Sequence, residues 1–145
     1  MRKIRFRGKA TMSIEELNEI GIKHDSGWVY GSLIIDNNMA FIVGRVIEWD
    51  EEYLAHEWWV MVDIGTVGQY TEFKDKNDKE IYDGHTLTRD GFWSIRIEYE
   101  DGCFWVRDLD PVRYANRILN RPVPEFNFAN WEITGNIYEN PELSK

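Results

Sequence analysis

The chain lacks the features that mark secreted and membrane proteins. It has a single cysteine, Cys103, and so cannot form a disulfide within itself. Its beginning has no apolar run of the kind found in signal peptides, and no stretch approaches the roughly 20 apolar residues that a membrane helix needs. Because disulfides are rare in reducing compartments, these absences predict a soluble protein of the cytoplasm that does not associate with membranes.

Basic residues are also scarce. The chain has 17 Lys and Arg against 26 Asp and Glu, a formal net charge of −9 at pH 7. Such a charge repels phosphate backbones at long range, which disfavours general nucleic-acid binding. The exception is the basic segment, residues 2–9, which has no acid. Its cations are Arg2, Lys3, Arg5, Arg7 and Lys9.

Aromatic side chains, in contrast, are plentiful. They make up 14% of the residues, with seven tryptophans, and apolar residues make up 43%. This is enough to bury a hydrophobic core and to leave some aromatic side chains for an interface.

Two short elements are expected near the N-terminus. Residues 3–7 alternate basic and apolar side chains, which places Ile4 and Phe6 on one face of a strand and the cations on the other; the pattern indicates an edge or arm strand. Residues 13–16 have the spacing of a helix capping box, and Gly21 is a typical helix stop. One short helix of about two turns is therefore predicted between them.

The rest of the chain predicts β-strands. Asp36-Asn37-Asn38 separates two apolar segments and favours a hairpin, and Asp101-Gly102 is typical of a two-residue type I′ turn, in which both positions need positive φ. The expected strands are residues 28–35, 39–47, 57–63, 66–70, 92–99, 103–107 and 131–138, with connections at 73–83 and 109–130.

Metal binding is not indicated. His24, His56 and His85 are far apart, and none has the spacing that presents two ligands from one element. Residues 75–80 begin like a calcium-binding loop, but Lys and Glu stand at its fifth and sixth positions, where the loop needs an oxygen ligand and a glycine. We expect an exposed β-turn there, and no metal or cofactor.

Catalysis is the weakest of the functions that the sequence allows. Asp83, His85 and Cys103 include the carboxylate, imidazole and thiol of a nucleophilic site. Cys103 follows a hairpin turn, however, and is more simply a small apolar residue at a strand start. The chain also lacks a glycine-rich phosphate loop and a Gly-x-Ser-x-Gly motif. We therefore expect no enzymatic activity.

Two further groups of residues are candidates for binding a partner. Three arginines spaced by four residues would form a cationic stripe on a helix. This stripe could bind phosphates or the carboxylates of a partner. The alternative is that the arginines are solvated or form ion pairs within the chain. Trp58 and Trp59 are adjacent in an expected strand, so both are buried only if each face of the strand is covered. Another subunit, a second sheet layer or a loop of the same chain would serve equally as the cover. The candidate interaction residues are Arg2, Lys3, Arg5, Arg7, Trp58, Trp59, Arg113, Arg117 and Arg121.

Several motifs resemble the YopX family of bacteriophage and prophage proteins. The most specific are Thr66-Val67-Gly68-Gln69-Tyr70-Thr71, Lys74-Asp75-Lys76-Asn77 and Glu80-Ile81-Tyr82-Asp83-Gly84. They occur in the family's order and, with the others, extend over most of the chain. The supporting motifs are Phe6-Arg7, Trp28-Val29-Tyr30-Gly31, Tyr99-Glu100-Asp101-Gly102 and residues 135–143.

The chain departs from the family's pattern in three places. Glu72-Phe73 and Asn77-Asp78 stand where the family usually has Gly-Leu and Asn-Gly, and His85 stands where it usually has an aspartate. Without glycine, a tight turn of positive φ is less comfortable. Without the aspartate, the most site-like acid of the family's pattern is missing.

The resemblance implies a mainly β protein with a small SH3-type barrel in residues 65–145. Residues 1–64 then hold a β-strand arm, the short helix and a β-hairpin region, or the chain is one continuous domain. The resemblance brings no activity, substrate, cofactor or catalytic residue. The side chains expected in the barrel core are Ile95, Ile97, Tyr99 and either Phe104 or Val106.

We therefore expect a non-enzymatic phage or prophage accessory protein in the cytoplasm of the bacterial host. Its partner would be a second copy, in a homo-oligomer, or another host or phage protein. The alternative is a nucleic-acid-binding protein that uses the basic segment and the arginine stripe. The acidic remainder of the chain weighs against this alternative.

Overall fold

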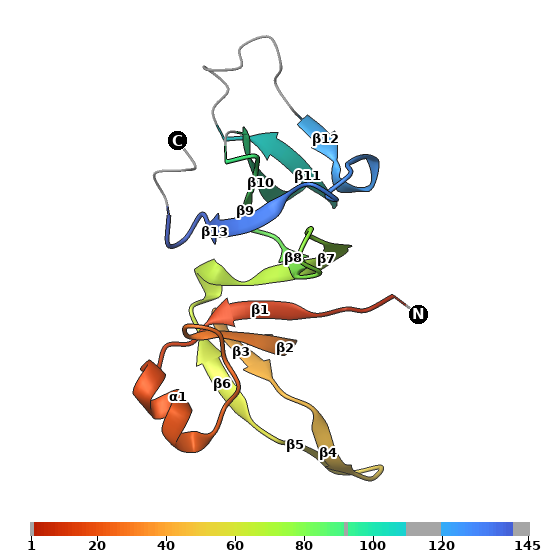
Figure 1. Ribbon diagram of the computed structural model, residues 1–145. Helices are drawn as coiled ribbons and strands as arrows, with labels where there is room; N and C mark the ends of the chain where they lie inside the picture. Colours follow the sequence, from red (N-terminus) through yellow and green to blue (C-terminus); the bar gives the residue numbers. More distant parts are fainter. Residues whose placement is uncertain (1, 92, 110–119, 141–145) are drawn as a thin grey trace. The chain divides into compact units, whose positions relative to one another are not determined.

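The computed structural model describes residues 2–91, 93–109 and 120–140. The chain divides into two compact units, Met1–Gln69 and Tyr70–Lys145. Both are built of antiparallel strands, and the described residues include one α-helix, which lies in the N-terminal unit (Figure 1). The sequence prediction of a mainly β protein with one short helix is confirmed.

The N-terminal unit is a twisted antiparallel sheet with a helix and a separate hairpin. Its strands pair in the order β6-β3-β2-β1, and the first residues of β7 (Gly68–Lys74) pair with β1. β4 and β5 pair only with each other among the described residues. The elements are β1 (Phe6–Lys9), α1 (Ile14–Ile20), β2 (Trp28–Asp36), β3 (Met39–Val43), β4 (Val46–Trp49), β5 (Leu54–His56), β6 (Trp59–Val62) and the 3-10 helix η1 (Ile64–Thr66).

The prediction that β1 is an edge or arm strand is wrong. β1 has a neighbour on each side, because Phe6 pairs with both Gly31 of β2 and Gln69 of β7. Beyond β1, Ala10 forms a bridge with Val62. Of the predicted residues 3–7, only Phe6 and Arg7 lie in β1, where Phe6 packs against the core. The alternation carried no information on how many strands flank this one.

The core of this unit lies between α1 and one face of the sheet. The Ser13 hydroxyl accepts a hydrogen bond from the Glu16 NH at 3.1 Å, and Gly21 ends the helix at φ 87°, so the predicted cap and stop are confirmed. Leu17 is fully buried, whereas Ile20 is 62% exposed. The buried core residues are Leu17, Ile22, Val29, Ala40, Ile42, Val60 and Val62.

Both predicted hairpin turns are present. Asn37 and Asn38 connect β2 to β3 with φ of 48° and 65°, so this two-residue turn has the positive φ at both positions that type I′ requires. Asp101 and Gly102 connect β10 (Trp93–Glu100) to β11 (Cys103–Asp108) with φ of 52° and 79°. These turns set the register of both hairpins.

The C-terminal unit is a five-stranded antiparallel sheet with β8 and the end of β7 beside it. The order of the five strands is β12-β11-β10-β9-β13, and the described residues form no closed barrel. β7 starts in the N-terminal unit and pairs with β8 in this one. The remaining elements are β8 (Glu80–Tyr82), β9 (His85–Arg89), β12 (Asn120–Pro122), the 3-10 helix η2 (Val123–Glu125) and β13 (Glu132–Asn136).

Most of the expected core of this unit is buried. Ile95, Ile97 and Val106 are at most 1% exposed, and Phe104 packs against them half-buried. Tyr99 is 52% exposed, so its prediction as a core residue is wrong. It pairs with Phe104 near the turn of the hairpin, which extends past the buried layer. The other buried core residues are Ile81, Leu87, Val123, Phe128 and Trp131.

The exposed turn expected at residues 75–80 begins on a buried acid. Residues 76–79 are exposed as predicted, but Asp75 is 6% exposed. One oxygen of its carboxylate accepts hydrogen bonds from the NH groups of Asn77 (2.8 Å) and Lys79 (3.0 Å). The acid that seemed to start a calcium loop therefore holds the backbone of its own turn.

Candidate interaction surface

Cations in β1 and just before it lie over aromatic rings of β2. The guanidinium carbon of Arg7 lies 4.2 Å from the centre of the Trp28 ring, and that of Arg5 lies 5.8 Å from the Tyr30 ring. The ammonium of Lys9 lies 5.9 Å from the Trp28 ring. Arg7 is only 2% exposed, so it stabilises the sheet by a cation–π contact and is not the surface residue that the sequence suggested.

The hydroxyl of Tyr30 shares this environment. Burial raises the pKa of Tyr30 above its ordinary value of 10.0, and the neighbouring Arg7 charge and its hydrogen bond act in the opposite direction. Since burial prevails, Tyr30 is neutral at physiological pH.

A pocket of about 550 Å³ opens beside Tyr30 within the N-terminal unit. Its apolar lining includes Ile4, Val43 and Trp58, and its two acids are Asp25 and Glu57. We call it the cationic groove, after the four cations that also line it: Lys3, Arg5, Lys23 and Arg45.

The base of the groove depends on a glycine. A Cβ atom on Gly44 would lie 2.7 Å from the indole of Trp58, which is closer than real Cβ atoms approach. Gly44 therefore lets the indole fill the space at the junction of β3 and β4. Three of the sequence candidates, Lys3, Arg5 and Trp58, lie at this groove, whereas Arg2 is exposed ahead of β1.

The two adjacent tryptophans have different environments. Their adjacency predicted opposite faces and left open whether both are covered. Trp58 is half-buried against the core of its unit and lines the groove. Trp59 is 65% exposed and meets Phe41 edge to face, with ring centres 5.9 Å apart. The sheet and helix of one chain therefore cover one of these indoles and leave the other largely in solvent.

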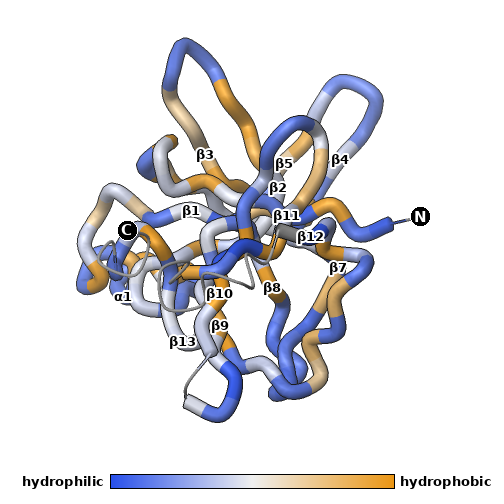
Figure 2. The backbone as a smooth tube through the Cα atoms, turned by 90° about the horizontal axis from the view of Figure 1, so that it is seen from above, coloured by the Kyte–Doolittle hydropathy of each residue, from blue (hydrophilic) through white to orange (hydrophobic). Residues whose placement is uncertain are grey.

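Trp59 belongs to an exposed apolar face of the sheet. Ile34 of β2 pairs with Phe41 of β3, and Phe41 pairs with Met61 of β6, so their side chains lie in a row across three strands. Ile34 is 49% exposed, Met39 41% and Met61 37%. In Figure 2 the hydrophobic stretch of β3 is visible along the backbone. We call Ile34, Met39, Phe41, Trp59 and Met61 the outer face.

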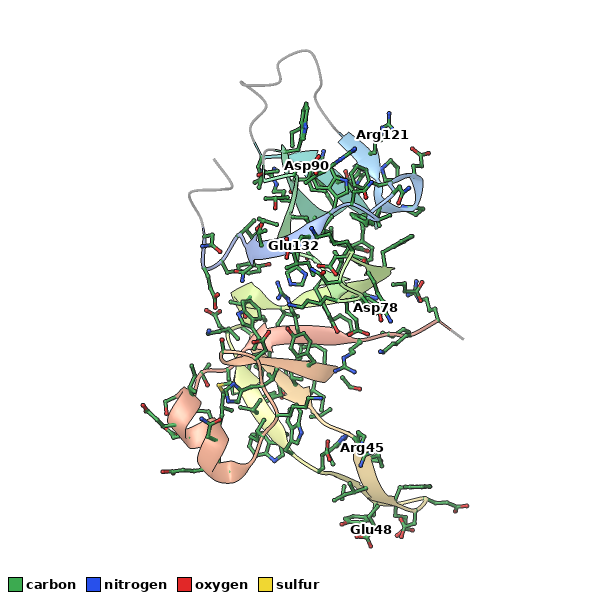
Figure 3. The ribbon with its side chains drawn as sticks, viewed as in Figure 1. Arg45, Glu48, Asp78, Asp90, Arg121 and Glu132 are labelled. Atoms are coloured by element: carbon green, nitrogen blue, oxygen red, sulfur yellow. The ribbon has the colours of Figure 1, made fainter. Side chains whose placement is uncertain are left out.

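The β4–β5 hairpin, residues 46–56, is a second exposed apolar element. Ile47 is 58% exposed, Trp49 70% and Leu54 58%. We call this hairpin the acidic arm, because it has no Lys or Arg and carries four acids. Figure 3 labels Glu48 on the arm and Arg45 at its base. The acids are Glu48, Asp50, Glu51 and Glu52.

Of the three arginines of the proposed stripe, one lies in the part of the chain that the structure describes. Arg113 and Arg117 lie outside the described residues, and Arg121 is exposed in β12, where it pairs with Val106. Arg121 therefore lies in a strand rather than at the end of a helix, because Asn120–Pro122 adds to the free side of β11.

The three residues of the catalytic hypothesis each contact nearby backbone. The Nδ1 atom of His85 accepts a hydrogen bond from the Tyr82 NH at 2.9 Å, and Asp83 accepts one from the Tyr99 NH at 3.2 Å. The Cys103 sulfur lies 3.4 Å from the Phe104 carbonyl oxygen. The first two contacts hold the β8–β9 turn, which is a structural use of these groups.

Sequence reasoning missed the outer face and the acidic arm. Residues 39–47 were predicted as one strand, but the chain breaks at Gly44 and starts a new hairpin. The acids at 50–52, between the apolar residues of 46–49 and 53–55, were the available indication of a turn. The outer face had no such indication, because its residues come from three strands whose register only the fold defines.

Comparisons with known proteins agree with this architecture. The chain is similar to the crystal structure of protein EF1440 from Enterococcus faecalis, with 23% identity, 100% of both chains covered and a TM-score of 0.56. At this identity the likeness concerns the fold alone.

No curated protein matches the chain. None of the helices in the described residues is long and apolar enough to cross a membrane.

The sequence resemblance noted above is confirmed independently. The profile of the family described as YopX protein matches residues 32–145, which is most of the chain. This range includes the outer face, the acidic arm and the whole C-terminal unit. The chain therefore belongs to the YopX family.

Proposed function

We propose that this chain is a non-catalytic accessory protein of a bacteriophage or prophage, that it works in the cytoplasm of the host, and that it acts by binding protein. The partner that the surface fits best is a second copy of the chain. The observation that carries this proposal is the exposed apolar surface of the N-terminal unit, formed by the outer face and the acidic arm. Contiguous exposed apolar surface typically marks a site of protein interaction.

The free energies of burial and association favour a contact made of several residues. Burying a whole tryptophan side chain removes about 150–250 Å² from water. At about 25 cal/mol per Å², the exposed 65% of Trp59 gives roughly 2–4 kcal/mol at most. Association costs an estimated 4–15 kcal/mol in lost translation and rotation. One tryptophan is therefore insufficient, and the neighbouring Ile34 and Met61 have to be covered with it.

Charge supports a second copy as the partner. Exposed ion pairs contribute only about 0–1 kcal/mol each, so they select and orient partners rather than hold them. The chain carries both signs on its N-terminal unit, cations at the groove and acids on the arm. In a pair of copies, the acids on the arm of one copy can face the cations at the groove of the other.

The C-terminal unit is proposed to have the SH3-type arrangement. Its sheet of five short antiparallel strands, β13-β9-β10-β11-β12, supports this, since small barrels are built of such strands. Fold analogy does not select a ligand for it. A host or phage protein that binds this unit would be a second partner, additional to the copy.

Light scattering over micromolar concentrations tests the proposal. We expect an oligomer for the wild type and a monomer for the double variant Trp59→Ser/Met61→Ser, which removes the centre of the outer face. The control is Tyr99→Ser, which removes another aromatic residue that is more than half exposed, from the C-terminal unit, and should leave the mass unchanged. A monomeric wild type at every concentration would contradict self-association.

Nucleic-acid binding is the second candidate, and one observation favours it. The groove combines four cations with the rings of Tyr30 and Trp58, as sites that track a single strand do. The net charge of −9 and the burial of Arg7 weigh against it. Fluorescence anisotropy with a single-stranded oligonucleotide decides: binding that weakens steeply with salt and is lost in Lys3→Glu/Arg45→Glu supports it, and no binding at low salt removes it.

A further inference from the structure

We propose that the acidic arm of one copy inserts into the cationic groove of another, so that two copies are joined by exchanged arms. This inference rests on the self-association proposed above and names the two surfaces that meet. It assigns a ligand to the groove, namely an acidic peptide hairpin with aromatic and aliphatic side chains.

The arm has the chemistry of a ligand. Trp49 pairs with Leu54 across the hairpin, and both are more than half exposed. The acids stand beside them at positions 48 and 50–52. An isolated two-stranded hairpin is marginally stable in water, so a surface that covers its apolar side chains would stabilise it.

The groove has the complementary chemistry. Its four cations outnumber its two acids, and Ile4 and the indole of Trp58 give it an apolar wall. Pockets that bind ligands usually measure about 300–1,000 Å³. A volume of about 550 Å³ therefore suits one large side chain, such as that of Trp49, with neighbouring carboxylates at the cationic rim.

Within one copy the arm is held away from the groove. The arm begins directly after Arg45 and ends directly before Glu57, which both line the groove. Its turn lies four strand residues further out, about 13 Å at 3.3 Å per residue. The turn is fixed by the Asp50 NH, which donates to the Tyr53 carbonyl at 2.9 Å, and by the Glu52 NH, which donates to the Asp50 carboxylate at 2.8 Å.

Geometry therefore separates the acids of the arm from the cations of the groove in each chain. In Figure 3, Arg45 lies at the base of the arm and Glu48 lies further along it. In a pair of copies, the arm of each copy can reach the groove of the other. A two-fold arrangement places both arms in both grooves at once, so the assembly is closed as a dimer.

Charge reversal on each surface tests the exchange. The arm variant is Glu51→Lys/Glu52→Lys and the groove variant is Lys3→Glu/Arg45→Glu. The control Glu19→Lys/Glu125→Lys changes the net charge as the arm variant does, at exposed acids elsewhere. Circular dichroism confirms that each variant is folded, and sedimentation at micromolar concentration measures association.

We expect each surface variant alone to associate at least about tenfold more weakly than the wild type, and the control to associate normally. Mixing the arm and groove variants should restore a dimer, because one intact arm then meets one intact groove. The restored contact should weaken with salt.

Three outcomes would overturn the inference, and they can be distinguished from one another. A wild-type oligomer whose mass is unchanged in the arm variant rejects the arm exchange and leaves self-association through the outer face standing. A monomeric wild type rejects self-association itself. If the groove variant keeps its mass but loses oligonucleotide binding, the groove belongs to a nucleic acid and the exchange is also rejected.

Discussion

The carboxylate of Asp75 accepts a hydrogen bond from the backbone NH of Ile133, 58 residues further along the chain, at 3.0 Å. Its other oxygen binds the NH groups of Asn77 and Lys79. One buried acid thus ties the turn between β7 and β8 to β13. It links an early and a late segment of the C-terminal unit, where a purely local turn was expected.

Replacing Asp75 with alanine should destabilise the protein by about 2–4 kcal/mol, because three backbone NH groups lose their acceptor in a largely buried site. Urea unfolding measures the change. The control Lys76→Ala removes only an exposed ion pair with Glu132, 3.6 Å long, and should change stability by less than about 1 kcal/mol. Equal unfolding midpoints for Asp75→Ala and the wild type would show that the three hydrogen bonds contribute nothing net.

Glu72 and Asp78 stand where the YopX pattern usually has glycine, and both retain a glycine-like backbone, with φ of 75° and 64°. A residue with a Cβ is strained in this region, and glutamate more than aspartate. Glu72→Gly should therefore stabilise the protein by about 0.5–1 kcal/mol, and Asp78→Gly by less. Thermal melting measures both.

The neighbouring Lys79 is the matched control for the two glycine variants, since it is exposed and is not among the residues of positive φ. Lys79→Gly should destabilise the protein, because glycine then adds only freedom to the unfolded chain. A lower melting temperature for Glu72→Gly than for the wild type would contradict the strain argument.

Ile97 is fully buried in the core of the C-terminal unit. Ile97→Asp should unfold this unit, since an unpaired carboxylate in that core costs several kcal/mol. Tyr99→Asp, two residues along the same strand at 52% exposure, should melt within a few degrees of the wild type. Circular dichroism distinguishes the two, and an Ile97→Asp protein with wild-type melting would mean that the assigned core face is wrong.

Stability should fall at alkaline pH, partly because of Tyr30. Burial raises its pKa in the folded chain above 10.0, the ordinary value. The unfolded chain therefore loses the proton first, so the free energy of unfolding is unaffected well below pH 10.0 and decreases as the pH rises through and beyond it. Tyr30→Phe should show a smaller decrease between neutral pH and a pH above 10.0, measured by urea unfolding.

Tyr70 provides a comparison for Tyr30, since burial raises its pKa in the same direction. Tyr70→Phe should also reduce the alkaline decrease, and the double variant should reduce it further. An alkaline decrease that is identical in the wild type and in Tyr30→Phe would show that Tyr30 ionises equally easily in both states.

The sequence by itself determined the local features and the family. The cap at Ser13, the stop at Gly21 and the turns at Asn37-Asn38 and Asp101-Gly102 depend on residues within a few positions of one another, so their φ preferences and hydrogen bonds are readable without the fold. The family motifs are equally local, which is why the family was recognisable from them. The alternation of Ile95 and Ile97 indicated the core face for the same reason.

Only the tertiary structure decided which side chains are buried and which residues contact one another. Arg7 is charged, yet it is buried because the register of β1 and β2 brings the Trp28 ring over it. Tyr99 continues a buried alternation, yet it is exposed because the hairpin extends past its core. A side chain's pattern fixes the face it points to, but whether that face is covered depends on strands and loops far away in the sequence. For the same reason the outer face and the groove could be assembled only from the folded chain.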